Sequence, residues 1–237
     1  MNLSDIKIKS FPGSKRHVEK KVSLWMYFII RPASFYPTCL AYNLNISANQ
    51  ATLFGFFCGM TSIMMAYQGY MFLAALFLNI FAIIDCVDGN LARLRESTKV
   101  GEYLDAVSGD IIYYTFLPIF LYSAFRDGNL NHLEEISPVP IMSIIVAIAF
   151  IQLLSGMANQ RLKVIFNKDA VDEEIKSPSI FELLLRNGYG VAFLFPSSLL
   201  VSTFNYYDIL LLYMTISAPA YYVISILRAI KYKDNAA

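Results

Sequence analysis

The amino-acid sequence predicts an all-α integral membrane protein, with six transmembrane helices that follow an N-terminal interfacial segment. Of its 237 residues, 57% are hydrophobic and only 16% are charged, whereas soluble domains carry about a quarter charged residues. Several apolar runs approach or exceed the ~20 residues that cross the hydrocarbon core of a bilayer, and the mean hydropathy is +0.50. The net charge of +1 gives no indication of a nucleic-acid partner.

Residues 1–48 are expected to form a cytoplasmic, amphipathic segment at the membrane interface. They contain seven Lys and Arg residues against two acidic ones, and Trp25, Tyr27 and Phe28 follow the basic stretch. Basic residues followed by aromatic ones are typical of a segment that lies on an anionic membrane surface. A disordered basic tail is the alternative. No cleavable signal peptide is expected, because the polar, basic start is too long for one.

Six apolar segments follow, and they place both ends of this chain on the same side of the membrane. The predicted spans are residues 49–68, 70–94, 104–125, 139–157, 189–204 and 209–227. They define a transmembrane domain over 49–228 and a cytoplasmic tail over 229–237. Nearly all Lys and Arg residues fall on the side of the termini, and the opposite loops hold Arg126 alone, so the positive-inside rule makes that side cytoplasmic. A transporter or channel would need polar residues along several spans, and the fourth and sixth carry little beyond Ser, Thr and Gln.

Two glycines of the first predicted span, Gly55 and Gly59, are four residues apart. In membranes this spacing lets two helices approach closely. A chance pair of glycines in an apolar helix is the alternative, so the pair does not by itself indicate a particular contact.

The stretch from Asp85 to Asp110 brings charge into two apolar runs. A carboxylate at the centre of a membrane helix costs roughly 2.5–3.5 kcal/mol on insertion scales, so a group of them requires a compensating partner. At about 100° per residue, five residues share one helical face: Asp85, Asp88, Gly89, Ala92 and Arg93. Two carboxylates on one face can hold a hard divalent cation, and an arginine one turn along can bind a phosphate oxygen. Asp105, at the start of the next span, would complete the metal shell, and a cluster of salt bridges at the helix end is the alternative.

The same stretch resembles the signature of the CDP-alcohol phosphotransferase (CDP-alcohol phosphatidyltransferase) family, D-x2-D-G-x2-A-R-x7-8-G-x3-D-x3-D. The positions in register are Asp85, Asp88, Gly89, Ala92, Arg93, Gly101 and Asp105. Upstream, Asn49 and Thr52 match the family's T-P-N-x-x-T segment, while Ala48 stands where proline is usual. The resemblance covers roughly residues 30–228 and includes the six-span architecture.

The resemblance implies a transferase that moves a phosphoryl-alcohol group from a CDP-linked donor, such as CDP-diacylglycerol, to an acceptor alcohol and releases CMP. Such a reaction belongs to the synthesis of phospholipids or related phosphodiesters. The implied cofactors are two Mg²⁺ or Mn²⁺ ions, with Asp85, Asp88 and Asp105 as ligands. The implied contacts of the CMP part are Asn49, Thr52, Gly89, Ala92 and Arg93. A homodimer is also implied, and the expected location is a bacterial inner (cytoplasmic) membrane with the active site facing the cytoplasm.

The last position of the signature departs from the family, because Gly109 stands where the fourth aspartate is expected and Asp110 comes one residue later. In a regular helix Gly109 lies about 40° from Asp105, and Asp110 lies about 140° away. The family's fourth aspartate is its general base, so the catalytic candidates here are Asp105 and Asp110. Three explanations stay open: a π-bulge that turns Asp110 into the site, proton transfer to water or substrate, or a non-catalytic relative that binds CDP-linked ligand and metal without turnover. Ser108 would contribute a hydroxyl in any of them.

Charged residues after the fourth span are candidates for binding the acceptor. In related enzymes with phosphorylated acceptors, basic residues of this region bind the phosphate. The candidates in this sequence are Arg161 and Lys163 after the fourth span, and Glu182 and Arg186 before the fifth. Lys99, in the hairpin of the signature, is an exposed charge with no assigned role. Ordinary positive-inside charge is the alternative.

Overall fold

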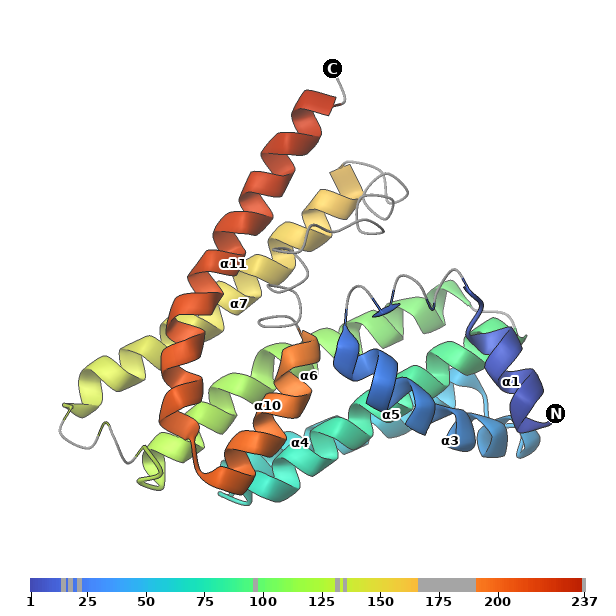
Figure 1. The fold of residues 1–237 in the computed structure, drawn as a ribbon, viewed down its shortest axis with the longest axis horizontal. Helices are drawn as coiled ribbons and strands as arrows, with labels where there is room; N and C mark the ends of the chain where they lie inside the picture. Colours follow the sequence, from blue (N-terminus) through green and yellow to red (C-terminus); the bar gives the residue numbers. More distant parts are fainter. Residues whose placement is uncertain are drawn as a thin grey trace.

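The computed structural model describes residues 1–13, 16, 19–20, 23–95, 98–130, 133, 136–165 and 191–235. Within these ranges every regular element is a helix, which confirms the all-α class (Figure 1). The elements are α1 (Leu3–Ser10), the π-helix η1 (Met26–Ile30), α3 (Arg31–Asn43), α4 (Ala48–Tyr67), α5 (Met71–Arg95), α6 (Lys99–Arg126), α7 (Pro138–Ile165), α10 (Val191–Phe204) and α11 (Tyr207–Asn235).

Helix α5 is the central element, and it contacts α1, η1, α3, α4, α6 and α10. Its inner positions include Ala74, Ala75 and Ala82, each completely buried, which let neighbouring helices approach its backbone. The glycine pair of α4 serves the same purpose. A Cβ atom at Gly55 would lie 3.2 Å from the Ile84 side chain of α5, and one at Gly59 would lie 2.6 Å from the Ile112 side chain of α6. Gly55 therefore allows α5 to pack closely against α4, and Gly59 allows α6 to do so.

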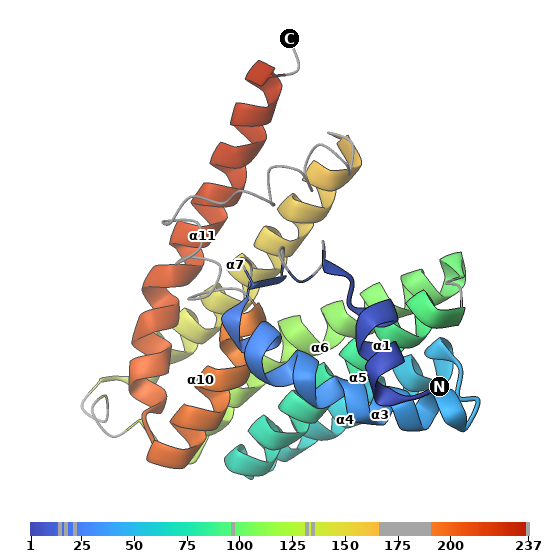
Figure 2. The same ribbon diagram turned by 45° about the vertical axis from the view of Figure 1, so that its right-hand side comes forward.

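Helices α7 and α11 form a second arm of the molecule. They pack against each other, and α7 also packs against α6. Figures 1 and 2 show their C-terminal parts running side by side, away from the bundle of α4, α5 and α6. The bundle and this arm are therefore joined mainly through α6.

Four of the described helices are long and apolar enough to cross a membrane: α5, α6, α7 over Pro138–Ala158, and α11 over Tyr207–Leu227. This finding supports a membrane protein, but the prediction of six spans is not confirmed. Helix α4 has the required length at 20 residues, yet polar residues such as Asn49, Gln50 and Thr52 lower the hydropathy of its first turns. Helix α10 has only 14 residues, which is shorter than the ~20 that a span requires.

Helix α6 begins at Lys99, five residues before the predicted start of the third span at about Leu104. The side chain of Thr98 caps the helix by accepting a hydrogen bond from the Gly101 N–H at 3.1 Å. Gly101 and Asp105 therefore both lie in the first two turns of α6. Helices α7 and α11 also continue past their predicted ends, to Ile165 and Asn235.

The described part of the N-terminal segment is folded against the bundle, so a disordered tail is wrong for these residues. Ile6, Phe11 and Phe35 are at most 6% exposed and form a small apolar cluster that also touches Leu94 of α5. Helix α1 starts at an Asn2 cap, whose side chain accepts from the Asp5 N–H at 2.8 Å. The segment is thus held at the end of α5 that carries the signature.

Candidate functional site

A cavity of about 230 Å³ lies between α4, α5 and α6. Its lining residues are Ser47, Ala48, Asn49, Thr52, Asp88, Gly89, Ala92, Arg95, Thr98, Gly101, Glu102 and Asp105. The structure therefore brings together six residues that were assigned to the site on sequence: Asn49, Thr52, Asp88, Gly89, Ala92 and Asp105. Three other assigned residues, Asp85, Arg93 and Asp110, are described by the structure but do not line this cavity.

The start of α4 is fixed by a capping box. The Ser47 hydroxyl accepts from the Gln50 N–H at 3.2 Å, and the Gln50 side chain accepts from the Ser47 N–H at 2.9 Å. Proline, usual in the family at the position of Ala48, favours a helix start because its backbone is already helical. The capping box supplies that start here, so Asn49 and Thr52 still reach the cavity wall.

Asn49 of α4 reaches the cavity because Gly101 leaves room for it on α6. A Cβ atom at Gly101 would lie 2.5 Å from the Asn49 Oδ1 and 3.1 Å from the Thr98 Oγ1. Both distances are too short for an ordinary contact, so only glycine fits without displacing Asn49. The glycine of the signature and the asparagine upstream are therefore in direct contact.

The acidic residues meet where α5 and α6 converge. Asp88 is only 4% exposed, interacts with the Thr52 side chain, and is close enough to Asp85 and Asp105 to feel their charges. Like charges grouped in a poorly solvated place repel each other unless a cation compensates them, and oxygen ligands suit hard divalent ions. Among the residues that the structure describes, no three acidic, His or Cys side chains form a preassembled metal site. The donor chemistry fits a hard divalent cation, and Asp88 and Asp105 face the same cavity from two helices.

Arg95 is a lining residue that the sequence reasoning missed. Its guanidinium donates to the Ile46 carbonyl at 2.9 Å and to the Tyr42 carbonyl, and lies 4.6 Å from the centre of the Tyr42 ring. Asp88, Ala92 and Arg95 follow the i, i+4, i+7 pattern of one helical face. That pattern was readable, because Arg95 lies about 80° from Asp85, as far as Arg93 does on the other side, but only Arg93 was assigned to the site. Ser47, Thr98 and Glu102 were missed as well.

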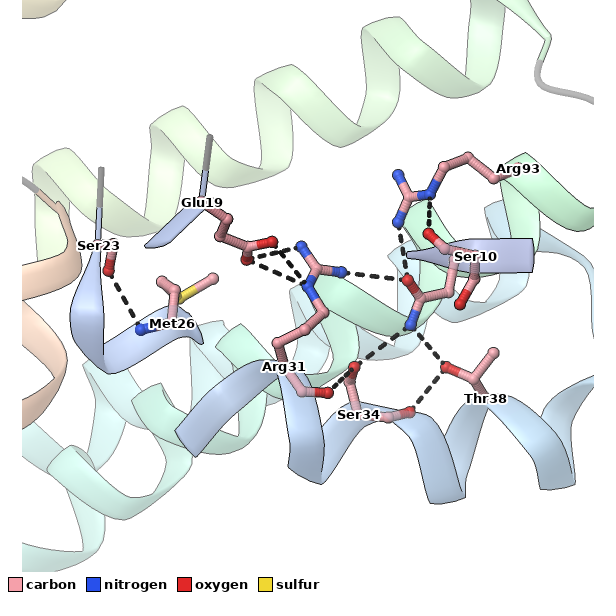
Figure 3. A network of polar contacts seen from close by, with 9 residues as sticks. Ser10, Glu19, Ser23, Met26, Arg31, Ser34, Thr38 and Arg93 are labelled. Carbon is pink, nitrogen blue, oxygen red and sulfur yellow. Dashed lines mark hydrogen bonds and ion pairs between the residues drawn. The ribbon is translucent and has the colours of Figure 1, made fainter. Parts of the chain in front are cut away.

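Arg93 points toward Ser10 of the N-terminal segment (Figure 3). Its Nε donates to the Ser10 carbonyl at 2.7 Å, and its Nη2 donates to the Asn90 Oδ1 at 2.7 Å. A Cβ atom at Gly89 would lie 3.4 Å from the Arg93 Nη1, so the guanidinium passes directly beside that glycine. The arginine of the signature is therefore next to a cavity-lining residue without lining the cavity itself.

A second arginine, Arg31 of α3, completes this buried network. Its side chain is 7% exposed and forms an ion pair with Glu19, with Nη2 3.0 Å from Oε1. Burial alone lowers the pKa of the Arg31 guanidinium, but neighbouring negative charge, that of Glu19 included, outweighs it and raises the pKa above its ordinary value. Arg31 therefore stays charged at every physiological pH.

Asp110 is engaged away from the cavity. Its Oδ2 accepts a hydrogen bond from the Gln160 Nε2 of α7 at 2.7 Å. Over Lys99–Arg126, α6 is α-helical throughout, so the proposed π-bulge at Gly109 is wrong. A Cβ atom at Gly109 would lie 3.3 Å from the Tyr113 Cε2, and the Ser108 hydroxyl donates to the Asp105 carbonyl at 2.9 Å. The regular helix therefore turns Asp110 toward α7.

The candidates for acceptor binding are only partly described. Arg161 is exposed near the end of α7, and Lys99 is exposed at the start of α6. Lys163 lies on α7, but the position of its side chain is not described. Glu182 and Arg186 lie outside the described residues. The phosphate-binding role of Arg161, Lys163 and Arg186 stays a prediction.

Comparison with known protein families gives a match. A family model described as CDP-alcohol phosphatidyltransferase matches residues 45–180, which is more than half of the chain. The match contains every residue that lines the cavity and is narrower than the 30–228 range of the sequence resemblance. No curated protein matches the chain.

Proposed function

Because the chain belongs to the CDP-alcohol phosphatidyltransferase family, we propose that it transfers a phosphatidyl-type group from CDP-diacylglycerol or a similar CDP-linked donor to an acceptor alcohol. The family is one of membrane transferases that act on CDP-alcohol donors and are generally dependent on divalent metals. The observation that carries the proposal is the shared cavity, in which Asp88 of α5 and Asp105 of α6 face the residues at the start of α4.

The nucleotide end of the donor would bind against α4 and α5. Asn49 and Thr52 supply hydrogen-bonding side chains there, and the small Gly89 and Ala92 leave space for the ligand beside the α5 backbone. Arg93, beside Gly89, supplies positive charge for the phosphates. These residues bind and orient the donor so that its distal phosphorus faces the carboxylates.

Asp85, Asp88 and Asp105 are the residues that would hold two divalent ions, Mg²⁺ or Mn²⁺. When bound, such ions neutralise the donor pyrophosphate and stabilise the leaving CMP. Asp85 and Asp88 come from α5 and Asp105 comes from α6, so the packing of these two helices would set the positions of the three carboxylates. Asp105 lines the cavity and Asp110 does not, which makes Asp105 the candidate catalytic carboxylate on the α6 side.

The acceptor oxygen forms a bond to the distal phosphorus of the donor, and the bond from that phosphorus to the oxygen of CMP breaks. The proton of the acceptor hydroxyl must then leave. Asp110 is a poor recipient, because its carboxylate is bonded to Gln160 on the α7 side. The proton of the acceptor hydroxyl therefore goes to water or to a phosphate oxygen of the substrate.

The reaction would take place at the cytoplasmic face of a bacterial inner membrane. The cavity lies at the end of α5 and α6 that carries Arg93, Arg95 and Lys99, and the far end of α6 carries Arg126. By the positive-inside rule the cavity end is cytoplasmic. A homodimer with one site in each protomer, and the six-span arrangement in which α4 and α10 also cross the bilayer, belong to the same proposal.

A second candidate function follows from Gly109. If the absent aspartate is essential, the protein binds CDP-linked ligands and metal without turnover. The bond between Asp110 and Gln160 favours this candidate, because it removes the nearest replacement from the cavity. Release of CMP separates the two functions.

The experiment is to purify the protein in lipid nanodiscs and to follow CMP release from CDP-diacylglycerol with Mg²⁺ or Mn²⁺. The acceptors to be screened are glycerol 3-phosphate, inositol, inositol phosphate, serine and sugar alcohols. Asp88→Asn should abolish release, whereas the matched change Asp127→Asn, at the far end of α6, should not. If the protein binds CMP but forms none from CDP-diacylglycerol with any acceptor, the non-catalytic candidate is favoured. If it neither binds CMP nor forms it, the transferase proposal is refuted.

A further inference from the structure

Asn90 lies on α5 behind the cavity and is completely buried. Its amide oxygen accepts hydrogen bonds from two arginines, from Nη1 of Arg31 at 3.1 Å and from Nη2 of Arg93 at 2.7 Å. Its amide nitrogen donates to the Ser34 hydroxyl at 3.3 Å and to the Thr38 hydroxyl at 3.0 Å. Both N–H groups and the oxygen are thus engaged, which fixes the orientation of the amide.

The two guanidinium groups around Asn90 are compensated differently. Arg31 is paired with Glu19, which accepts from both its Nε and its Nη2. Arg93 is held by neutral oxygens only, those of Asn90 and the Ser10 carbonyl, and no described carboxylate lies within ion-pair distance of it. The positive charge of Arg93 is therefore fixed in place but not neutralised by a direct partner among the described residues.

This charge, which has no direct ion-pair partner among the described residues, lies beside the cavity. Gly89 lines the cavity, and a Cβ atom there would lie 3.4 Å from the Arg93 Nη1. Since glycine has no side chain, nothing of residue 89 beyond its backbone separates the guanidinium from a ligand at that wall. A bound anion would accept hydrogen bonds from a group that is already oriented, so little ordering entropy would be lost.

We propose that Asn90 is a positioning residue for the donor, which holds the Arg93 guanidinium beside Gly89 so that its charge meets the phosphates of the CDP-linked substrate. This inference rests on the proposed function and adds a residue that the family signature leaves open, since position 90 is unspecified in it. Asn90 also links the donor site to α3 through Ser34 and Thr38, and to the N-terminal segment through Arg31 and Glu19.

The test compares variants that separate this role from a structural one. Asn90→Leu removes the acceptor of Arg93, and Asn90→Asp keeps an acceptor oxygen but adds a negative charge beside Arg93. Thr38→Val removes the α3 hydroxyl that accepts from the Asn90 amide. Asn90→Ser replaces the leucine variant if that variant does not fold, as judged by size-exclusion chromatography and circular dichroism. KM and kcat for CDP-diacylglycerol and Kd for CMP are measured for each, alone and combined with Arg93→Ala.

If Asn90 acts through Arg93, Asn90→Leu raises KM and the Kd for CMP roughly tenfold with kcat nearly unchanged, because ground-state binding of the donor is lost. Asn90→Asp should also raise KM, because its carboxylate would pair with Arg93 and neutralise the charge that meets the phosphates, whereas Thr38→Val should stay within about threefold of the wild type. Adding Asn90→Leu to Arg93→Ala should change nothing further. An effect of Asn90→Leu that adds in full to Arg93→Ala, or an equal rise in KM for Thr38→Val, would overturn the inference while leaving the transferase intact. A wild-type protein that neither binds nor releases CMP would instead refute the proposed function, and this inference with it.

Discussion

The Asp110 carboxylate and the Gln160 amide are joined by a 2.7 Å hydrogen bond across the contact between α6 and α7. Asp110 follows directly after position 109, where the family has its aspartate. The bond shows that the Asp110 carboxylate lies on the side of α6 that faces α7, away from the cavity. Asp110 therefore acts as a link between the bundle and the arm of α7 and α11 rather than as a part of the cavity.

The first prediction concerns this link. Asp110→Asn preserves an oxygen that can accept from Gln160, so turnover should stay within about threefold of the wild type, because an acceptor oxygen suffices for the contact. CMP release at saturating donor and acceptor is the measurement. A loss of turnover of a hundredfold or more, with CMP binding retained, would show that Asp110 is the base after all.

A second prediction concerns restoration of the family aspartate at position 109. The ring of Tyr113 occupies the space beside Gly109 and is packed against Phe81 and Phe195, with centroid distances of 5.4 and 6.0 Å. Gly109→Asp should lower the free energy of unfolding by about 1–3 kcal/mol through overpacking, and should not raise turnover. Thermal unfolding and CMP release measure the two effects.

Gly109→Ala is the control for this experiment, because its methyl group requires a shift of only a few tenths of an ångström from Tyr113. Combining Gly109→Asp with Tyr113→Leu should recover stability. If Gly109→Asp alone is as stable as the wild type, the Tyr113 ring does not block position 109.

The third prediction concerns the contact between Gly101 and Asn49. Gly101→Ala would place a methyl group 2.5 Å from the Asn49 Oδ1, so Asn49 must leave its position at the cavity wall. KM for the donor should rise by about threefold to tenfold with little change in kcat, since a binding contact is lost. Gly13→Ala is the matched control, because no atom lies within 4 Å of the added Cβ. Equal kinetics for the two variants would contradict the contact.

The fourth prediction concerns Arg95, which connects the end of α5 to the turn between α3 and α4. Arg95→Ala leaves the Ile46 and Tyr42 carbonyls without this donor and should lower the free energy of unfolding by about 1–3 kcal/mol. Thermal unfolding in detergent measures the loss. Lys99→Ala, which removes an exposed charge four residues later, should leave the melting temperature unchanged. An unchanged melting temperature for Arg95→Ala would show that other contacts hold the turn.

Much of the site could be predicted because its residues follow the helical period. Asp88, Gly89 and Ala92 lie on one face of α5, and the start of α4 matched the family segment, so their shared cavity was foreseeable. Arg93 and Asp110 could not be placed in the same way. Arg93 is held by Ser10, 83 positions earlier in the chain, and Asp110 by Gln160, 50 positions later. Local periodicity carries no information about such distant partners.

The helix boundaries and spans show a similar division. Apolar runs identified α5, α6, α7 and α11 because burial and lipid exposure both require apolar side chains. The early start of α6 depends on a single cap at Thr98, which a hydropathy pattern does not record. The N-terminal segment is held by the contact of Phe11 and Phe35 with Ile6. The basic composition of the segment gives no indication of this packing between residues far apart in the sequence.

All residues that line the cavity lie between Ser47 and Asp105, on three consecutive helices. A ribosome makes that stretch before any residue of α7, α10 or α11, so a nascent chain can assemble the donor site while its second half is still unmade. The two halves can then also change separately during evolution. Under the proposed function, substitutions after Arg126 would change which alcohol is accepted while the cavity keeps its shape.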